Sequence, residues 1–281
     1  MATYKEINGT DITVVSSDPS NPLIGEVWYN TTTQKLKGYQ QVLGNAWSTG
    51  GNLNTARAAL AGAGIQTAAL AFGGATPTFT GATESYNGSS WTTVNPMNTA
   101  KRYVGNAGTQ TSALAFGGET SPGADLNETE LWNGTNWTEV NDLGTAKFRV
   151  GNAGASNTSA LCFGGRNAPG TRYADTELWN GTNWTEINNL NQAKDELGSS
   201  GIATAALAFG GNVPPGTANT EEWNGVSWVE VNNLSNVTIA NTGGTGTTNA
   251  SLNAGGIVGG SPTALTEEWN VPSNVVKTLT D

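Results

Sequence analysis

The sequence predicts an all-β protein built from repeated four-stranded antiparallel sheets, arranged as the blades of a β-propeller. Composition is the first reason: glycine supplies 38 of 281 residues, only 12% of residues are charged, and Asn and Thr are abundant. These residues disfavour helices and suit short strands joined by tight turns. The second reason is a block of about 46 residues that recurs five times, a period typical of propeller blades.

A Gly-Gly pair that ends an apolar segment is the first landmark of the repeat. Successive pairs are 44, 47, 46 and 49 residues apart, and four of them follow Ala-Leu-(Ala or Cys)-Phe. The five pairs are Gly73-Gly74, Gly117-Gly118, Gly164-Gly165, Gly210-Gly211 and Gly259-Gly260.

A second landmark, Thr-Glu-x-(Trp or Tyr)-Asn, follows each pair. Five residues beyond its aromatic residue stands a tryptophan in four repeats: Trp91, Trp137, Trp184 and Trp228. Ten residues further comes a basic residue in three of them, with Thr238 at the fourth place: Lys101, Lys147 and Lys194. Trp47 and Arg57 show the same ten-residue step, so the N-terminal region joins this register.

Strands can be assigned within the second repeat. Small residues 104–108 suit an innermost strand, where blades crowd around an axis, and the apolar run 112–116 suits a strand that is buried on both faces. Thr129 to Trp132 is the third strand, Asn133-Gly134 supplies a tight turn, and residues 137–140 are the outer strand.

The number of blades has two interpretations. In the favoured one, residues 1–53 form a first blade and give six, with Val275 to Thr280 as the outer strand of the last. In the alternative, five blades are completed by Trp47, and residues 1–40 are a separate anchor. Either way the repeats occupy residues 54–281, divided at about 54–98, 99–144, 145–191, 192–235 and 236–281.

Enzyme chemistry is hard to place in this chain, and we expect no cofactor, no metal and no catalytic residue. Histidine, the commonest general base and metal ligand, is absent, and there is one cysteine, Cys162, interpreted as a small buried residue. Most acids recur once per repeat, which favours a structural role: Glu84, Glu130, Glu177, Glu221 and Glu267. We expect them to pair with the recurring Arg57, Lys101, Lys147 and Lys194. The unique acids Asp125, Asp175 and Asp195 leave a glycoside hydrolase as a remote alternative.

Binding is expected on the face that carries the variable loops. The connections after each Gly-Gly pair differ in length and content, and in a propeller they share one face with the connections between blades. Loops on a rigid scaffold commonly carry recognition. The candidate binding residues are Phe79, Tyr103, Phe148, Arg166, Arg172 and Tyr173. Net charge is −10, which argues against nucleic acid as a partner, and no apolar run indicates membrane insertion.

Two resemblances add to this interpretation. The Gly-Gly pair, the aromatic residue and the following tryptophan resemble the kelch motif over about residues 47 to 270, although the aromatic-to-tryptophan spacing is shorter than in standard kelch repeats. The opening Gly25-Glu26-Val27-Trp28-Tyr29 and the Ala-Leu-Ala-Phe-Gly-Gly repeats are similar to those of virion structural proteins of marine tailed bacteriophages.

The second resemblance implies a virion localisation, as a tail fibre, appendage or capsid decoration. Its implied partners are other virion proteins, further copies of the chain and a host-surface glycan or receptor. A soluble carbohydrate-binding lectin is the alternative from another class.

Overall fold

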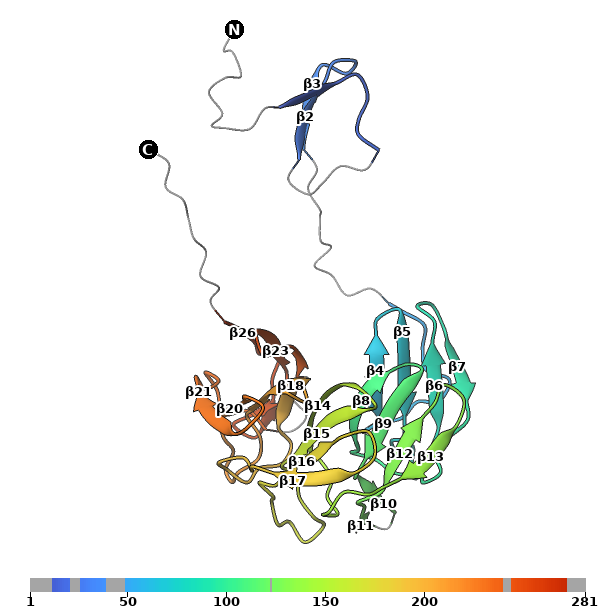
Figure 1. The fold of residues 1–281 in the computed structure, drawn as a ribbon, viewed down its shortest axis with the longest axis vertical. Coiled ribbons are helices and arrows are strands. Elements are labelled where there is room, and N and C mark those ends of the chain that lie inside the picture. Colours follow the sequence, from blue (N-terminus) through green and yellow to red (C-terminus); the bar gives the residue numbers. More distant parts are fainter. Residues whose placement is uncertain (1–11, 21–25, 39–48, 122, 240–243, 272–281) are drawn as a thin grey trace. The chain divides into compact units, whose positions relative to one another are not determined.

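The computed structural model describes residues 12–20, 26–38, 49–121, 123–239 and 244–271 (Figure 1). The chain divides into two compact units, Met1–Thr49 and Gly50–Asp281. The second unit therefore begins slightly before the expected boundary at residue 54. Gly51 explains this, because it lies against the first sheet so closely that an added Cβ would come within 2.4 Å of the Ser89 carbonyl oxygen. The described residues include no helix long and apolar enough to cross a membrane.

The N-terminal unit contains one three-stranded sheet in the order β1 (Thr13–Val15), β2 (Val27–Asn30) and β3 (Lys35–Gly38). Strands β1 and β2 run parallel, with Thr13 opposite Trp28. Parallel neighbours need a crossover connection, so this sheet is not the antiparallel meander that a first blade requires. The described strands of residues 1–53 therefore do not have the strand pairing expected of a first blade. The strand expected around Trp47 lies outside the described residues, as does Val275 to Thr280.

Four antiparallel four-stranded sheets make up most of the second unit, and their strand order follows the sequence (Figure 1). The first sheet is β4 (Ala61–Ile65), β5 (Ala68–Phe72), β6 (Thr83–Tyr86) and β7 (Trp91–Val94). The second is β8 (Gly105–Thr109), β9 (Ser112–Phe116), β12 (Thr129–Trp132) and β13 (Trp137–Val140). The third is β14 (Gly151–Ser156), β15 (Ser159–Phe163), β16 (Thr176–Trp179) and β17 (Trp184–Ile187). The fourth is β18 (Gly198–Ile202), β19 (Ala205–Phe209), β20 (Thr220–Trp223) and β21 (Trp228–Val231). The expected strands of the second repeat are confirmed, and the architecture is all-β and propeller-like.

The fifth sheet has three strands among the described residues: β22 (Thr245–Gly246), β23 (Ala250–Ala254) and β26 (Thr266–Asn270). Ala254 pairs with Thr266 as Phe209 pairs with Thr220 in the fourth sheet, so the Gly-Gly pair equivalent to the others is Gly255-Gly256. The assignment of Gly259-Gly260 to this role is wrong. That pair instead turns a small hairpin between β24 (Ile257–Val258) and β25 (Ser261–Pro262). A similar hairpin, β10 (Glu119–Thr120) and β11 (Ala124–Asp125), follows the second Gly-Gly pair.

The innermost strands β4, β8, β14, β18 and β22 contact one another in sequence order and line a hollow of about 390 Å³. Small residues are required here. A Cβ on Gly105 would lie 2.2 Å from the Phe116 ring and 2.8 Å from Val150 of the next sheet. The expectation of a small-residue inner strand is confirmed, and its cause is crowding between sheets.

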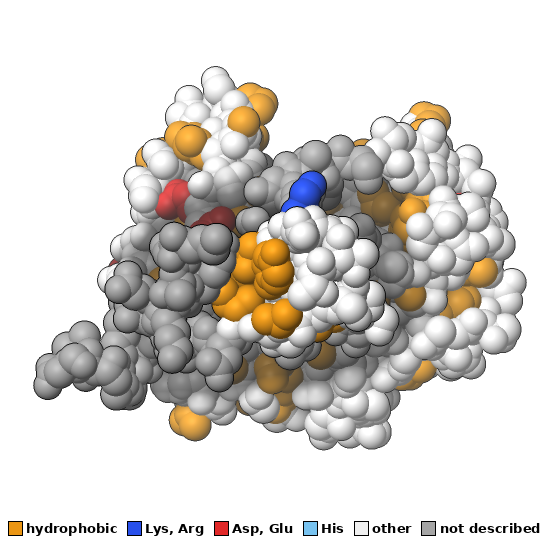
Figure 2. All heavy atoms as spheres, turned by 90° about the horizontal axis from the view of Figure 1, so that it is seen from above, with side chains coloured by type: hydrophobic (Ala, Val, Ile, Leu, Met, Phe, Trp, Pro, Cys, Tyr) orange, Lys and Arg blue, Asp and Glu red, His pale blue; other side chains and the backbone are white. Residues whose placement is uncertain are grey.

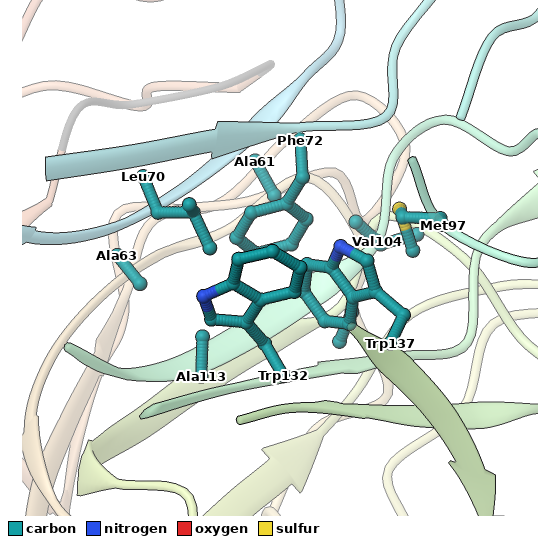
Figure 3. Close-up of a cluster of buried hydrophobic side chains, with 10 residues drawn as sticks. Ala61, Ala63, Leu70, Phe72, Met97, Val104, Ala113, Trp132 and Trp137 are labelled. Atoms are coloured by element: carbon teal, nitrogen blue, oxygen red, sulfur yellow. The ribbon is translucent and has the colours of Figure 1, made fainter. Parts of the chain in front are cut away.

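Adjacent sheets are joined by an aromatic contact that recurs (Figure 3). Trp137 of the second sheet packs on Phe72 of the first, with ring centroids 4.9 Å apart, and its Nε1–H donates to Thr83 Oγ1 at 3.0 Å. The same hydrogen bond joins Trp184 to Thr129 at 2.9 Å and Trp228 to Thr176 at 3.0 Å. Each of these tryptophans thus packs on the preceding sheet, and it does so because it occupies the same place in every repeat.

Candidate ligand-binding face

Two kinds of loop meet on one face of the repeat unit, called the loop face here: the connections between successive sheets and the segments after the Gly-Gly pairs. In every repeat a β-bridge joins the two. The bridged pairs are Ala58 with Ala75, Arg102 with Glu119, Phe148 with Arg166, Asp195 with Asn212, and Ile239 with Ile257. The expectation that these loops lie together is therefore confirmed.

A row of backbone hydrogen bonds crosses the loop face. The N–H of Tyr103 donates to the Ala59 carbonyl at 3.1 Å, that of Arg149 to Tyr103 at 3.3 Å, and that of Glu196 to Arg149 at 3.1 Å. All four residues have φ of 54° or 55°, a left-handed conformation that costs a non-glycine residue about 1–3 kcal/mol. One strained backbone position is thus kept in four repeats while its side chain changes from Ala to Tyr, Arg and Glu.

Arginine and aromatic side chains alternate along this row. Arg102 lies over Phe79 at 4.4 Å and over Tyr103 at 4.8 Å, measured from the guanidinium carbon to the ring centroid. Arg149 lies over Tyr103 at 4.5 Å, and Arg166 lies over Phe148 at 5.2 Å. Such contacts are attractive because the ring face is electron-rich, and they fix long side chains that would otherwise be mobile.

Carboxylates form ion pairs with the arginines of the loop face. Arg102 pairs with Glu119 at 2.7 Å, and Arg149 pairs with Glu196. Asp195, whose side chain has no exposed surface, lies 2.6 Å from Arg172 Nε and 3.4 Å from Arg166 Nε. Two arginines therefore share one buried carboxylate at this end of the row.

The predicted binding residues are brought together by this arrangement, with one qualification. Phe79, Tyr103, Phe148 and Arg166 belong to the stacked row, while Tyr173 lies beside it and accepts a hydrogen bond from Asn167 Nδ2 at 3.1 Å. Phe148 is only 3% exposed, so it supports the arginines above it and does not present a surface of its own. Binding by these residues stays a prediction.

Sequence reasoning missed Arg102, Arg149 and Glu196 and saw Asp195 only as an unplaced acid. A signal was available, because these residues directly follow the recurring basic residue, where the first repeat has Ala58 and Ala59. The loop face is therefore marked by a position at which the repeats carry different residues although the positions around it are alike.

The three unique acids are all engaged in polar contacts: Asp125 accepts the Ala168 N–H, Asp175 pairs with Lys147, and Asp195 holds the two arginines.

Four of the five recurring acids form the expected ion pairs; Glu267 instead accepts the Ser235 N–H at 2.8 Å. Arg57 lies 2.5 Å from Glu84, Lys101 3.2 Å from Glu130, Lys147 3.3 Å from Glu177, and Lys194 3.1 Å from Glu221. Each glutamate also accepts a backbone N–H from the preceding connection, such as that of Asn98 on Glu130 at 2.7 Å. The pair therefore fixes the strand of one sheet to the loop that leads into it.

The surroundings of two buried lysines shift their pKa values in opposite directions. Burial opposes the charged form of both. Around Lys147, Cys162 and the carboxylates of Asp175 and Glu177 outweigh burial and raise its pKa. Around Lys194, burial outweighs the carboxylates of Glu221 and Glu230, and its pKa is lowered. Burial raises the pKa of the nearby Cys162 thiol to about 12, partly offset by Lys147. That thiol is 0% exposed, as expected of a small core residue.

Exposed positive charge in residues 50–271 is confined to the loop face. Arg57, Lys101, Lys147 and Lys194 have fully buried side chains, whereas Arg102, Arg149, Arg166 and Arg172 are 21–32% exposed. On the face drawn in Figure 2, charged side chains are sparse among polar and apolar ones. Within residues 50–271, the loop face is thus the place where exposed positive charge gathers.

No family model and no curated protein matches the chain.

Proposed function

We propose that the chain is a non-enzymatic structural protein of a bacteriophage particle, a tail fibre, appendage or capsid decoration, which displays a propeller for binding to the host surface. The observation that carries the binding role is the row of stacked arginines on the loop face. Its side chains are fixed by rings and carboxylates, and they vary between repeats whose backbone is otherwise the same. Fixed side chains lose little entropy on binding, which favours recognition.

The propeller we propose has five blades, the last completed by a strand that carries Trp47. A cavity of about 70 Å³ beside the fifth sheet is lined by Phe209, Thr220, Leu234 and Trp269. The first three correspond to residues that surround Trp137, Trp184 or Trp228 in the earlier repeats. Trp47 supports this assignment because it precedes Arg57 by the same ten residues that separate Trp91 from Lys101. Residues 1–40 then attach the blades to the particle.

Labelling of intact particles with an antibody to the purified protein, viewed by electron microscopy, tests the virion role. Label at the tail supports an adsorption appendage, and label over the head supports a decoration protein. A protein that is found in cells but never on particles overturns the virion proposal.

A soluble bacterial lectin is the alternative that such a negative result would favour, since the loop face serves either role. The genes beside the one that encodes this chain discriminate between the two: genes for capsid and tail proteins would argue against the lectin. Hydrolysis of any glycan by the purified protein, lost when Asp195 is changed to Asn, would contradict the non-enzymatic role.

A further inference from the structure

Arg166 and Arg172 form an arrangement that the other arginines of the loop face do not share. Arg102 and Arg149 have one carboxylate each, but Arg166 and Arg172 have only Asp195 between them. The pair therefore carries one positive charge in excess. It lies where the exposed cations of residues 50–271 are gathered.

The contacts of the pair leave its outer nitrogens available. Both arginines face Asp195 with Nε, and the guanidinium carbon of Arg166 lies 5.2 Å from the centroid of the Phe148 ring. The described hydrogen bonds and ion pairs of these two side chains engage none of their terminal nitrogens. Because their side chains are 26% and 21% exposed, these nitrogens are the part that can meet a ligand.

The surrounding loop is held firmly in place. Asn167 N–H donates to the Thr171 carbonyl at 3.0 Å, Thr171 N–H donates to Asn167 Oδ1 at 2.8 Å, and Ala168 N–H donates to Asp125 of the neighbouring loop at 2.8 Å. Arg166 exchanges two backbone hydrogen bonds with Phe148, both at 3.0 Å. The two guanidinium groups are thus positioned before any ligand arrives.

We propose that Arg166 and Arg172 form a binding site for the carboxylate of an acidic saccharide. A guanidinium offers paired N–H groups that match a carboxylate in a bidentate geometry. The bridge between Arg166 and Arg172 places the two side chains on the same side of their hairpin, so both guanidinium groups can approach one carboxylate. The choice of a saccharide rests on the proposed function, because attachment to a host requires a polymer displayed on the cell surface.

Binding of the full chain to an array of uronic and sialic acid saccharides tests the site. Polygalacturonate and its methyl-esterified form are the matched pair, since they share a backbone and differ in the carboxylate. We expect the acidic form to bind at low salt and esterification to weaken binding at least tenfold. Binding should also weaken as salt rises, because the charges are partly exposed.

Three variants define the role of the pair. Arg166→Gln and Arg172→Gln are each expected to weaken binding at least tenfold, and Arg172→Lys should weaken it although the charge is kept. Lys35→Gln in the N-terminal sheet is the control, because it removes one exposed positive charge outside the loop face, and little effect on binding is expected. Arg166→Gln leaves the Arg172–Asp195 pair intact, so it remains informative if Arg172→Gln does not fold.

The outcomes separate this site from the general role of the loop face. Equal binding of the esterified polymer, or binding unchanged by Arg166→Gln, overturns the carboxylate site. If no acidic saccharide binds but labelled protein still adheres to host cells, the carboxylate site is wrong and the attachment role stands. If the protein also fails to adhere to host cells, both are contradicted.

Discussion

The third and fifth sheets are two copies of one repeat that differ in the side chains that connect neighbouring sheets. In the third, Lys147 is fully buried between Glu177 and Asp175, and Phe163 packs on Trp228 of the next sheet at 4.8 Å. In the fifth, Thr238 stands at the place of the lysine and Ala254 at the place of the phenylalanine. Glu267 is accordingly less buried than Glu177.

The strands of the fifth sheet pair although the connecting lysine and phenylalanine are replaced. Strands β23 and β26 keep a five-residue antiparallel register, and Ser235 N–H still donates to Glu267 at 2.8 Å. The pattern of small residues and turns is therefore enough to specify a sheet. The lysine, phenylalanine and tryptophan determine how firmly one sheet is held to the next.

Lys147→Thr, which places the residue of the fifth repeat in the third, should have the largest effect. It leaves Glu177 and Asp175 without their buried cation, and breaking such a pair destabilises a protein by about 3–5 kcal/mol. The free energy of unfolding in urea measures it. Glu267→Gln in the fifth sheet is the matched control, with an expected loss below about 1 kcal/mol because no lysine of the described residues forms an ion pair with that carboxylate. Equal losses would contradict the contrast between the two sheets.

Thr129→Val should have an intermediate effect. It removes the acceptor for Nε1–H of the partly buried Trp184. Because a fully buried unpaired donor costs about 1–3 kcal/mol, we expect a loss of about 1 kcal/mol. Thermal unfolding followed by tryptophan fluorescence detects the loss. Thr138→Val, at an exposed position of the same sheet, should leave stability nearly unchanged.

Chemical labelling of Cys162 tests whether the third sheet opens locally in the native state. A buried thiol with a pKa of about 12 forms almost no thiolate at pH 8. We expect no reaction with iodoacetamide in the folded protein and complete reaction in urea, measured by mass spectrometry. Rapid labelling of the folded protein would show that the third sheet opens enough to expose the thiol.

The smallest effect is expected in the N-terminal sheet at low pH. Hydrogen bonds from Lys37, Trp28 and Asn30 lower the pKa of Asp18 from 3.8 to about 2. Its contribution to stability is therefore complete above about pH 4 and is lost as the pH falls toward 2. Nuclear magnetic resonance titration of the Trp28 indole proton should show this transition in the wild type. Asp18→Asn should lack it.

The repeat made much of the fold predictable. Strand 112–116 and the pairing of Lys101 with Glu130 follow from features that recur at a fixed step, so the copies supply what one segment could not. The parallel pairing of β1 and β2 had no second copy to compare with. In the fifth repeat two Gly-Gly pairs compete, and only the pairing of Ala254 with Thr266 distinguishes them.

The position of the loop face could be predicted from the sequence, but the contacts among its side chains could not. Its stacked row joins Phe79 to Arg102, about half a repeat later in the sequence, and continues through Tyr103 to Arg149, about one repeat later. Their contact depends on the left-handed conformation at Tyr103 and Arg149, which favours glycine and which neither side chain indicates. Variation between the copies located the face, whereas side-chain geometry had to come from the structure.

A double-mutant cycle between Trp47→Phe and Thr220→Val tests most directly whether the fifth sheet is completed like the others. The cycle between Trp228→Phe and Thr176→Val is the internal standard, because that hydrogen bond is present at 3.0 Å. If Trp47 fills the slot beside Thr220, both cycles should show a coupling free energy of about 1 kcal/mol. Coupling in the standard, but additive effects of Trp47→Phe and Thr220→Val, would contradict the five-bladed arrangement.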